Sequence, residues 1–164
     1  MRKMLLLGAL VLLASAPAMA QETPKAEWFT GYSYTRDSGV NFNGWNTSVN
    51  GNFNDWFGLK ADFSGHYGSG VHLYSYTFGP QFSHRKNEKV VPFAHMLFGG
   101  ANVGGGGVSV NGFAMNFGGG LDWVASKSVA VRVIQVDALV IRIGGSTSTD
   151  PRISFGITFR LGSK

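Results

Sequence analysis

The chain of 164 residues contains no cysteine, which excludes disulfide bonds, thiolate metal sites and cysteine nucleophiles. After the first twenty residues it is also poor in glutamate, lysine and leucine, the residues that build surface helices, and no segment there repeats apolar residues at i, i+3, i+4 and i+7. Beyond the first twenty residues, no apolar run approaches the roughly 18 residues that a membrane-spanning helix needs. A helical membrane protein is therefore excluded.

The N-terminal segment has the three parts of an export signal. Arg2 and Lys3 form a basic head, Leu5 to Leu13 an apolar core, and Ala18-Met19-Ala20 a small-x-small cleavage site. This pattern predicts a Sec signal peptide over residues 1–20, cleaved between Ala20 and Gln21, and a single mature domain over residues 21–164. The alternative is an N-terminal membrane anchor, for which the apolar core is short.

The charge pattern gives no sign of nucleic-acid binding. The chain has 14 basic and 9 acidic residues, and removal of the signal peptide leaves 12 basic residues, a net charge of about +3, scattered along the sequence. The glycine-rich stretch GGGGVSVNG lacks the Gly-Lys-Ser/Thr ending of a phosphate loop. We therefore expect neither a nucleic-acid partner nor a bound cofactor.

What the sequence does contain is an alternation of apolar and polar residues with period two, which is typical of β-strands. In RISFGITFRLG, five apolar residues from Ile153 to Leu161 alternate with small or polar ones. Seven further segments of about ten residues or more follow the pattern, the first, fifth and seventh less cleanly: 27–36, 44–53, 56–66, 72–82, 89–101, 111–123 and 128–143. The facing of 89–101 stays open. Arg132 shares the parity of apolar neighbours, so either a β-bulge shifts the register or the side chain snorkels at a membrane boundary.

Eight such strands fit either a soluble barrel or a transmembrane one. The strands are long enough to cross a bilayer at a tilt, and their polar face carries Gly, Ser, Asn and Thr rather than a Lys/Glu mixture. The tryptophans fall at strand ends, as an aromatic girdle requires, with Trp28, Trp56 and Trp123 at one rim and Trp45 at the other. The sequence thus predicts an all-β fold, an eight-stranded antiparallel up-and-down transmembrane β-barrel.

The segments between the strands predict two unlike rims. Links at Asn54-Asp55, 84–88 and Ser126-Lys127 are expected at one rim. The connections 37–43, 67–71, 102–110 and 144–151 are expected at the opposite rim, two of them rich in Gly, Ser, Thr and Asn and longer than any link of the first rim. Within the glycine-rich stretch, Gly99, Gly118 and Gly120 are expected to face the lumen, where they leave room for long side chains.

Five stretches together resemble the small OmpA/OmpX-type outer-membrane β-barrel proteins of Gram-negative bacteria: EWFTGYSYTR, FGPQFS, PFAHMLFGG, FGGGLDW and ISFGITFRL. The resemblance implies an outer-membrane location, contact with lipid and lipopolysaccharide, and insertion by the barrel-assembly machinery, which reads the last strand. Members of the family usually end on an aromatic residue, whereas here four residues from Leu161 to Lys164 follow Phe159. An extracellular partner cannot be named from the loops.

The lumen of an eight-stranded barrel is filled by side chains, so charges inside it must be paired. Lys60, Asp62, His95, Asp122 and Asp137 are the predicted polar network, with Arg132 and Arg160 as further candidates. We expect this network to hold the barrel closed, and the alternative is a gated proton or ion path.

The four histidines do not predict a metal site, since His66 and His72 flank one turn without a third ligand nearby. The expected function is a non-enzymatic structural, surface-interaction or adhesion role. One alternative is a lipid-modifying enzyme of the lipid A deacylase or acyltransferase type, for which His66, Ser64 and Asp62 share a face. The other is a soluble exported barrel that binds a small ligand.

Overall fold

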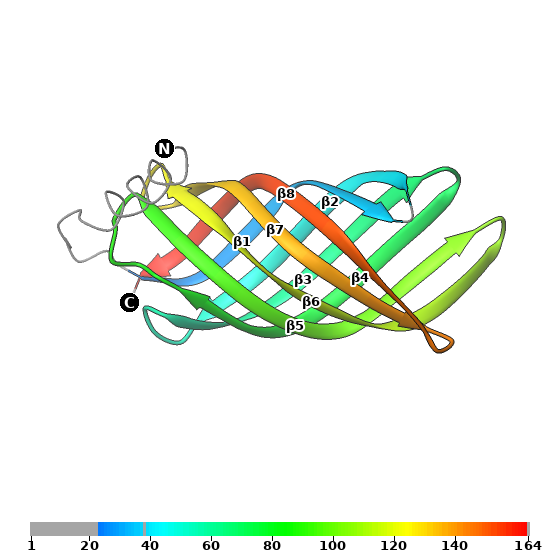
Figure 1. Ribbon diagram of the computed structural model, residues 1–164. Coiled ribbons are helices and arrows are strands. Elements are labelled where there is room, and N and C mark those ends of the chain that lie inside the picture. The colour runs from blue at the N-terminus through cyan, green and yellow to red at the C-terminus, as the bar shows by residue number, and fades with distance from the viewer. Residues whose placement is uncertain (1–22, 38, 164) are drawn as a thin grey trace, which may run out of the picture.

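The computed structural model describes residues 23–37 and 39–163, which form a closed antiparallel barrel of eight strands (Figure 1). The strands are β1 (Pro24–Asp37), β2 (Val40–Asn52), β3 (Phe57–Gly68), β4 (Val71–Ser83), β5 (Val90–Gly105), β6 (Val108–Val124), β7 (Val129–Ile143) and β8 (Ser146–Ser163). Each strand pairs with the next along the chain, and β8 pairs with β1 to close the sheet. The predicted eight-stranded up-and-down barrel is therefore confirmed. The predicted cleavage site between Ala20 and Gln21 lies outside the described residues.

The described residues contain no helix that is long and apolar enough to cross a membrane.

The two ends of the barrel differ. β1 begins and β8 ends at one of them, which also carries the connections 53–56, 84–89 and 125–128; we call it the terminal end (Figure 1). The opposite end, here the hairpin end, carries the other four connections, and those at 69–70, 106–107 and 144–145 have only two residues each. The prediction of longer loops at this end was wrong, because most of those residues continue the strands.

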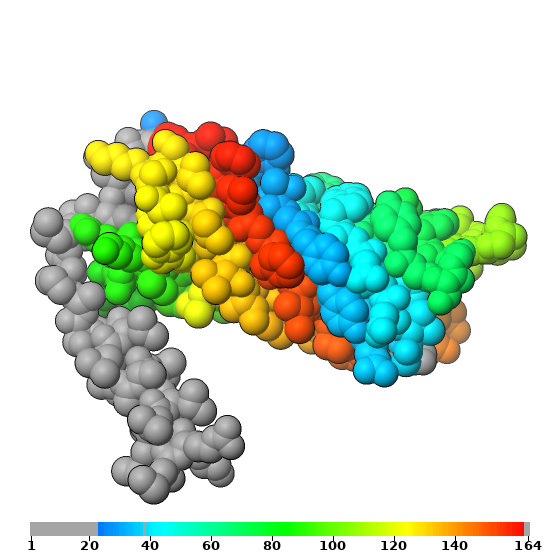
Figure 2. Space-filling view, turned by 90° about the horizontal axis from the view of Figure 1, so that it is seen from above, coloured from blue at the N-terminus to red at the C-terminus, as the bar shows by residue number. Residues whose placement is uncertain are grey.

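Pairs of glycines explain the short turns. Gly106 and Gly107 have φ of 61° and 86°, and Gly144 and Gly145 also have positive φ, a conformation that suits a two-residue hairpin. The strands pair right up to these turns, as in Gly104 with Ser109. Small polar residues that suggested loops therefore extend the hairpins, and the tip of the β5–β6 hairpin projects beyond the rest of the barrel (Figure 2).

The two faces of the sheet have opposite characters. Outward side chains are large and apolar: Phe155, for example, is 51% exposed and Ile157 46% exposed. Inward side chains are mostly polar or charged, and Asn46, Lys60 and Arg152 are fully buried. This arrangement inverts the usual distribution of a water-soluble barrel, in which the apolar face lies inside.

A cluster of apolar side chains lies inside the barrel toward the hairpin end. The cluster is built from Leu73, Ala101, Ala114, Leu139 and Ile141, of which the two alanines and Leu139 are fully buried. On β7, Leu139 is the next inward residue after Asp137, so the cluster borders the polar part of the lumen directly. We refer to these five residues as the apolar layer.

Candidate functional site in the barrel lumen

Arg152 on β8 is the centre of a buried ion network. Its Nε and Nη2 donate to Asp137 Oδ2 on β7 over 2.9 and 2.6 Å, and Nη2 also lies 3.0 Å from Asp62 Oδ1 on β3. All three side chains are fully buried. A buried guanidinium is stable only with such partners, since an unpaired charge away from water is strongly unfavourable. The network thus ties strands that are distant in the barrel.

Lys60 and His95 extend this network. Lys60 Nζ lies 3.7 Å from Asp62 Oδ2 and 3.4 Å from His95 Nδ1. Because an ammonium group can only donate, Nδ1 of His95 must accept, and the ring proton is assigned to Nε2. That nitrogen lies 3.0 Å from Asp137 Oδ1. The facing of the segment 89–101, which the sequence left open, is therefore settled, with His95 inside.

Arg132 also faces the lumen. Its Nε and Nη2 donate to the two carboxylate oxygens of Asp122 over 2.7 and 2.9 Å, and Nη1 donates to Gln135. The guanidinium lies between the rings of Phe29 and Phe93, 4.2 and 4.3 Å from their centroids, which adds cation–π attraction. The register of β7 shifts between Arg132 and Gln135. Of the two alternatives for Arg132, the β-bulge is the correct one.

A further ion pair lies at the terminal end of the lumen. Arg85, in the connection before β5, donates from Nη1 and Nη2 to the two oxygens of Glu27 over 3.1 and 2.6 Å. Asn52 donates to the same carboxylate. The side chain of Arg85 folds inward from this connection and is buried, whereas the neighbouring His84 is exposed.

His66 contacts a serine that sequence reasoning did not name. Its Nε2 lies 2.8 Å from Ser33 Oγ, which in turn lies 2.9 Å from Ser154 Oγ. Ser64 instead contacts Ser75, and Asp62 is bound in the Arg152 network. The three residues that share a face on β3 therefore do not form the His–Ser–carboxylate arrangement that acyl transfer needs.

His66 and His72 do not converge either. His66 is fully buried inside the barrel, whereas His72 is partly exposed, and its ring lies beside that of Tyr74 with the centroids 5.2 Å apart. In the described part of the chain, no group of three or more His, Cys, Asp or Glu side chains is placed to hold a metal ion.

The five residues predicted for the lumen network are all inside the barrel: Lys60, Asp62, His95, Asp122 and Asp137. Sequence reasoning missed the central cation, Arg152, and the pair of Glu27 and Arg85. A signal for Arg152 was present, because it has the parity of the small and polar residues of its strand. No comparable signal existed for Arg85, which lies outside any strand.

The four tryptophans lie on the outer surface of the barrel. Trp28, Trp56 and Trp123 are near the terminal end, and each is about half exposed. Trp28 packs against Phe159, and Trp56 stacks on Phe82. Trp45 lies farther toward the hairpin end, paired in register with Tyr32 and Gly65.

No protein-family model matches the chain, and no curated protein is significantly similar to it in sequence. Solved structures do resemble it. Ail, the attachment invasion locus protein of Yersinia pestis, matches with a TM-score of 0.54 and 19% identity, covering 85% of this chain and 99% of Ail. Ail has also been solved with the heparin analogue sucrose octasulfate, and as an outer membrane protein in a phospholipid bilayer nanodisc.

Neisserial surface protein A matches with a TM-score of 0.59 and 12% identity, covering 83% of this chain and 96% of that protein. The N-terminal β-barrel domain of OprF from Pseudomonas aeruginosa matches with a TM-score of 0.61 and 10% identity, covering 84% of this chain and 98% of the domain. At these identities the likeness establishes the fold: the chain has the architecture of the small eight-stranded outer-membrane barrels.

Proposed function

We propose that this protein is an integral outer-membrane β-barrel with a non-enzymatic role in surface contact or adhesion. In this proposal residues 1–20 are a Sec signal peptide, and the mature chain is inserted by the barrel-assembly machinery through β8. The hairpin end, from which the β5–β6 hairpin projects, then faces the cell exterior, and the terminal end faces the periplasm (Figure 2).

The observation that carries the proposal is the inverted distribution of side chains. Large outward residues such as Val133, 58% exposed, and Phe155, 51% exposed, would face water in a soluble barrel. Continuous apolar surface of this extent is unfavourable in water but suits the hydrocarbon of a bilayer. A soluble ligand-binding barrel would need the reverse arrangement, so this alternative has little support.

The tryptophans support the same orientation. Trp28, Trp56 and Trp123 suit the periplasmic interface, and Trp45 suits the outer one, because indole rings prefer the headgroup level. At the hairpin end, Arg36 and Arg142 point outward beyond this belt. These two cations can contact lipid phosphates, which makes lipopolysaccharide the expected lipid partner.

A contact role is supported by the projecting β5–β6 hairpin. Val108 and Val110 near its tip are 69% and 47% exposed, and such apolar side chains outside a membrane are suited to binding another surface. Ail, an attachment protein, and the neisserial surface protein share the architecture. The enzyme alternative is weakened because the His66–Ser33 contact is enclosed in the lumen, away from acyl chains.

Two experiments test the proposal. Folded barrels of this class resist SDS, so the purified protein should change its gel mobility on boiling and should fractionate with the outer membrane.

Bacteria that carry the protein should adhere to epithelial cells better than bacteria with an empty vector, and V108D/V110D should abolish the gain. The control variant N111S, which changes a residue of the same hairpin without adding a charge, should keep the gain in adhesion. Adhesion that is unchanged by V108D/V110D would count against the contact role, and loss of the mobility shift would count against the barrel in the membrane.

A further inference from the structure

Residues 108–111, at the start of β6, form an open strand edge. On one side they pair with β5. On the other side, β7 ends at Ile143, and the pairing of β6 with β7 begins only at Phe113, opposite Arg142. Within the described pairing, residues 108–111 therefore have a strand on one side alone. All four are exposed, and their hairpin projects beyond the rest of the barrel (Figure 2).

The backbone groups of this edge point alternately to its two sides. The two-residue turn at 106–107 is flanked by Gly105 and Val108, and the residues that flank such a turn hydrogen-bond to each other. In an antiparallel pair, positions of this kind alternate with positions whose N–H and C=O point away from the partner strand. Ser109 and Asn111 therefore direct their backbone groups away from β5. The edge offers them in the spacing that a further antiparallel strand would use.

The edge is braced and carries none of the usual protection. Across the hairpin, Asn102 Nδ2 donates to Asn111 Oδ1 over 2.8 Å, which holds the two strands together. The segment 100–112 contains no charged residue and no proline, the residues with which exposed sheet edges are commonly protected against pairing. The hairpin is thus held in a conformation that suits the addition of another strand.

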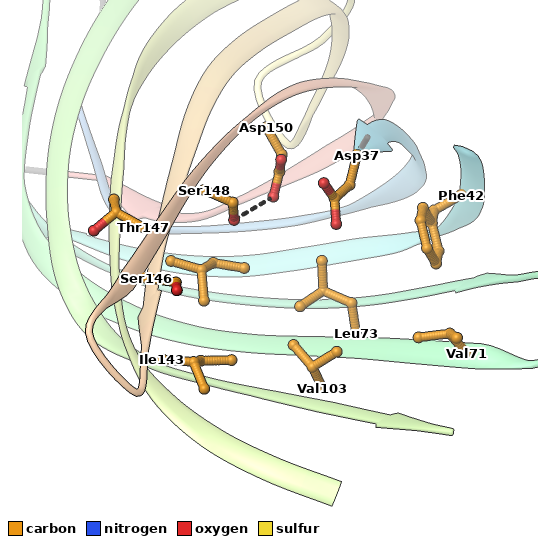
Figure 3. A pocket seen from close by; sticks show the side chains of 11 residues that line it. Asp37, Phe42, Val71, Leu73, Val103, Ile143, Ser146, Thr147, Ser148 and Asp150 are labelled. Carbon is orange, nitrogen blue, oxygen red and sulfur yellow. Dashed lines mark hydrogen bonds between the residues drawn. The ribbon is translucent and has the colours of Figure 1, made fainter. Parts of the chain in front are cut away.

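The inner face of the same hairpin is apolar. Val103 lines a cavity of about 250 Å³ at the hairpin end, together with Leu73 of the apolar layer and Ile143 (Figure 3). Val110 lies directly opposite Val103, so the two side chains share this face, and Val108 has the same parity. Val110 and Val108 are 47% and 69% exposed, respectively. A strand added at the edge would extend this apolar face and cover part of it.

We propose that this edge pairs with the same edge of a second copy of the protein, carried by a facing membrane. The pairing is antiparallel and centred on Val110, which lies opposite its own counterpart. Ser109 then exchanges backbone hydrogen bonds with the partner's Asn111, and Asn111 with the partner's Ser109. The two hairpins form one sheet with a continuous valine face. This inference rests on the proposed surface-contact role and names the partner of that contact.

The symmetry of the pairing decides how the two barrels face each other. Two copies that use the same edge are related by a two-fold axis, and an antiparallel pair that keeps the valines on one face has this axis perpendicular to the sheet. The barrel wall contains the direction of the barrel axis, so a half-turn about a perpendicular to the wall reverses that direction. The hairpin ends of the two copies therefore point toward each other, as in two cells in contact.

An extended peptide of another protein could use the same backbone groups, but the edge favours a copy of itself. Its two outward-bonding residues, Ser109 and Asn111, lie symmetrically about Val110, so a copy satisfies both of them at once. The segment has no charge that would repel a copy. A contact of four residues is weak alone, yet many copies in each membrane act together and raise the overall strength of the contact.

The test uses the purified barrel in vesicles of zwitterionic lipid, with clustering followed by light scattering. Wild-type vesicles should cluster with each other and not with protein-free vesicles. V110K and V110E should each cluster at least about fivefold more slowly, because like charges then meet on the two-fold axis. A mixture of V110K and V110E vesicles should regain the wild-type rate to within about twofold, since the opposed charges then attract.

Three control variants separate this pairing from other causes. S109P removes a backbone N–H on the open side and should slow clustering, whereas S109A keeps that N–H and should cluster like the wild type. S69K places a charge on the exposed turn between β3 and β4. It should cluster like the wild type, and S69K mixed with V110E should stay slow, which excludes general attraction between charged vesicles. Every variant is first checked for the change of gel mobility on boiling that shows a folded barrel.

Wild-type vesicles that stay dispersed, a V110K/V110E mixture that stays slow, or equal rates for S109A and S109P would each overturn the proposal. Clustering with protein-free vesicles would show binding to lipid and would overturn it as well. The wild-type comparison needs no variant, so it decides even if a substitution prevents folding. Dispersed vesicles together with intact adhesion to epithelial cells would leave the contact role standing, whereas loss of the mobility shift would count against the membrane barrel itself.

Discussion

Replacing Arg152 with methionine removes the guanidinium that joins Asp62 to Asp137 inside the barrel. In the wild type this group donates twice to Asp137, over 2.9 and 2.6 Å, and lies 3.0 Å from Asp62. Methionine fills much of the same volume but has no charge, so both carboxylates lose their strongest partner while they stay fully buried.

The expected loss is about 3–5 kcal/mol of unfolding free energy, the range measured when one partner of a buried ion pair is removed. The remaining contacts do not compensate. Asp62 keeps Lys60 at 3.7 Å and an amide hydrogen bond from Asn46. Asp137 keeps His95 and Gln135, both of which also interact with Lys60. We therefore expect R152M near the upper part of the range.

The assay is urea unfolding of the barrel in phospholipid vesicles, followed by tryptophan fluorescence. R142M is the matched control, because Arg142 is an outward, exposed arginine on β7, and its loss should change the free energy by about 0.5 kcal/mol or less. In a double-mutant cycle, R152M and D137N should couple by about 0.5–3 kcal/mol. A value for R152M within 1 kcal/mol of the control, or no coupling with D137N, would refute the view that this network holds the strands together.

Three further predictions follow from the geometry. A Cβ added at Gly118 would come within 2.1 Å of Asp137 Oδ1, so G118A should lower the unfolding midpoint in urea, whereas G51A, where a Cβ meets nothing within 4 Å, should leave it nearly unchanged; equal midpoints would contradict the tight packing of the lumen. The pKa of Asp150 is raised from 3.8 to about 6, so its proton uptake favours the folded state; this stabilisation is present below about pH 4 and is lost as the pH rises through 6. D150N should therefore raise the melting temperature at pH 8 and not at pH 4, and the same shift at both values would argue against the raised pKa of Asp150. On the outer surface, I157K should cost about 2–4 kcal/mol in vesicles if Ile157 faces the bilayer interior, and V108K at the hairpin tip should cost almost nothing; a tolerated I157K would contradict the membrane assignment.

The barrel could be predicted from the sequence because the signal for a strand is local. Ile153, Phe155 and Ile157 alternate with small or polar residues, and this pattern fixes which side chains face inward once a strand is assumed. The inward position of Lys60 and Asp62 follows from the same parity. What the pattern cannot give is which inward residue meets which, since that depends on the register between strands far apart in the chain.

The failures have physical reasons of the same kind. The bulge beside Arg132 breaks the parity of β7, and only its pairing with two neighbouring strands reveals the shift. The residues at 102–110 were expected to form a loop because they are rich in glycine, yet they pair as a hairpin up to Gly105 and Val108, which supplies their backbone hydrogen bonds. Arg85 lies in a connection, where no periodicity exists to show that it reaches Glu27 inside the barrel.

The seam between β1 and β8 has a consequence for how the chain could be connected. Pro24 and Ser163 are partners in register, and both lie at the terminal end, so a short linker could join them without disturbing a strand (Figure 1). Seven of the eight strand pairs are between neighbours in sequence, and this seam is the one that spans the chain. A circular permutant with a new opening at Gly106–Gly107 would turn the seam into an ordinary hairpin and make β5 and β6 the last strands to meet. The finished barrel would be the same, but it would be closed by the pairing of β5 with β6 instead of β8 with β1. The fold is therefore a suitable system for asking whether assembly depends on which strand comes last.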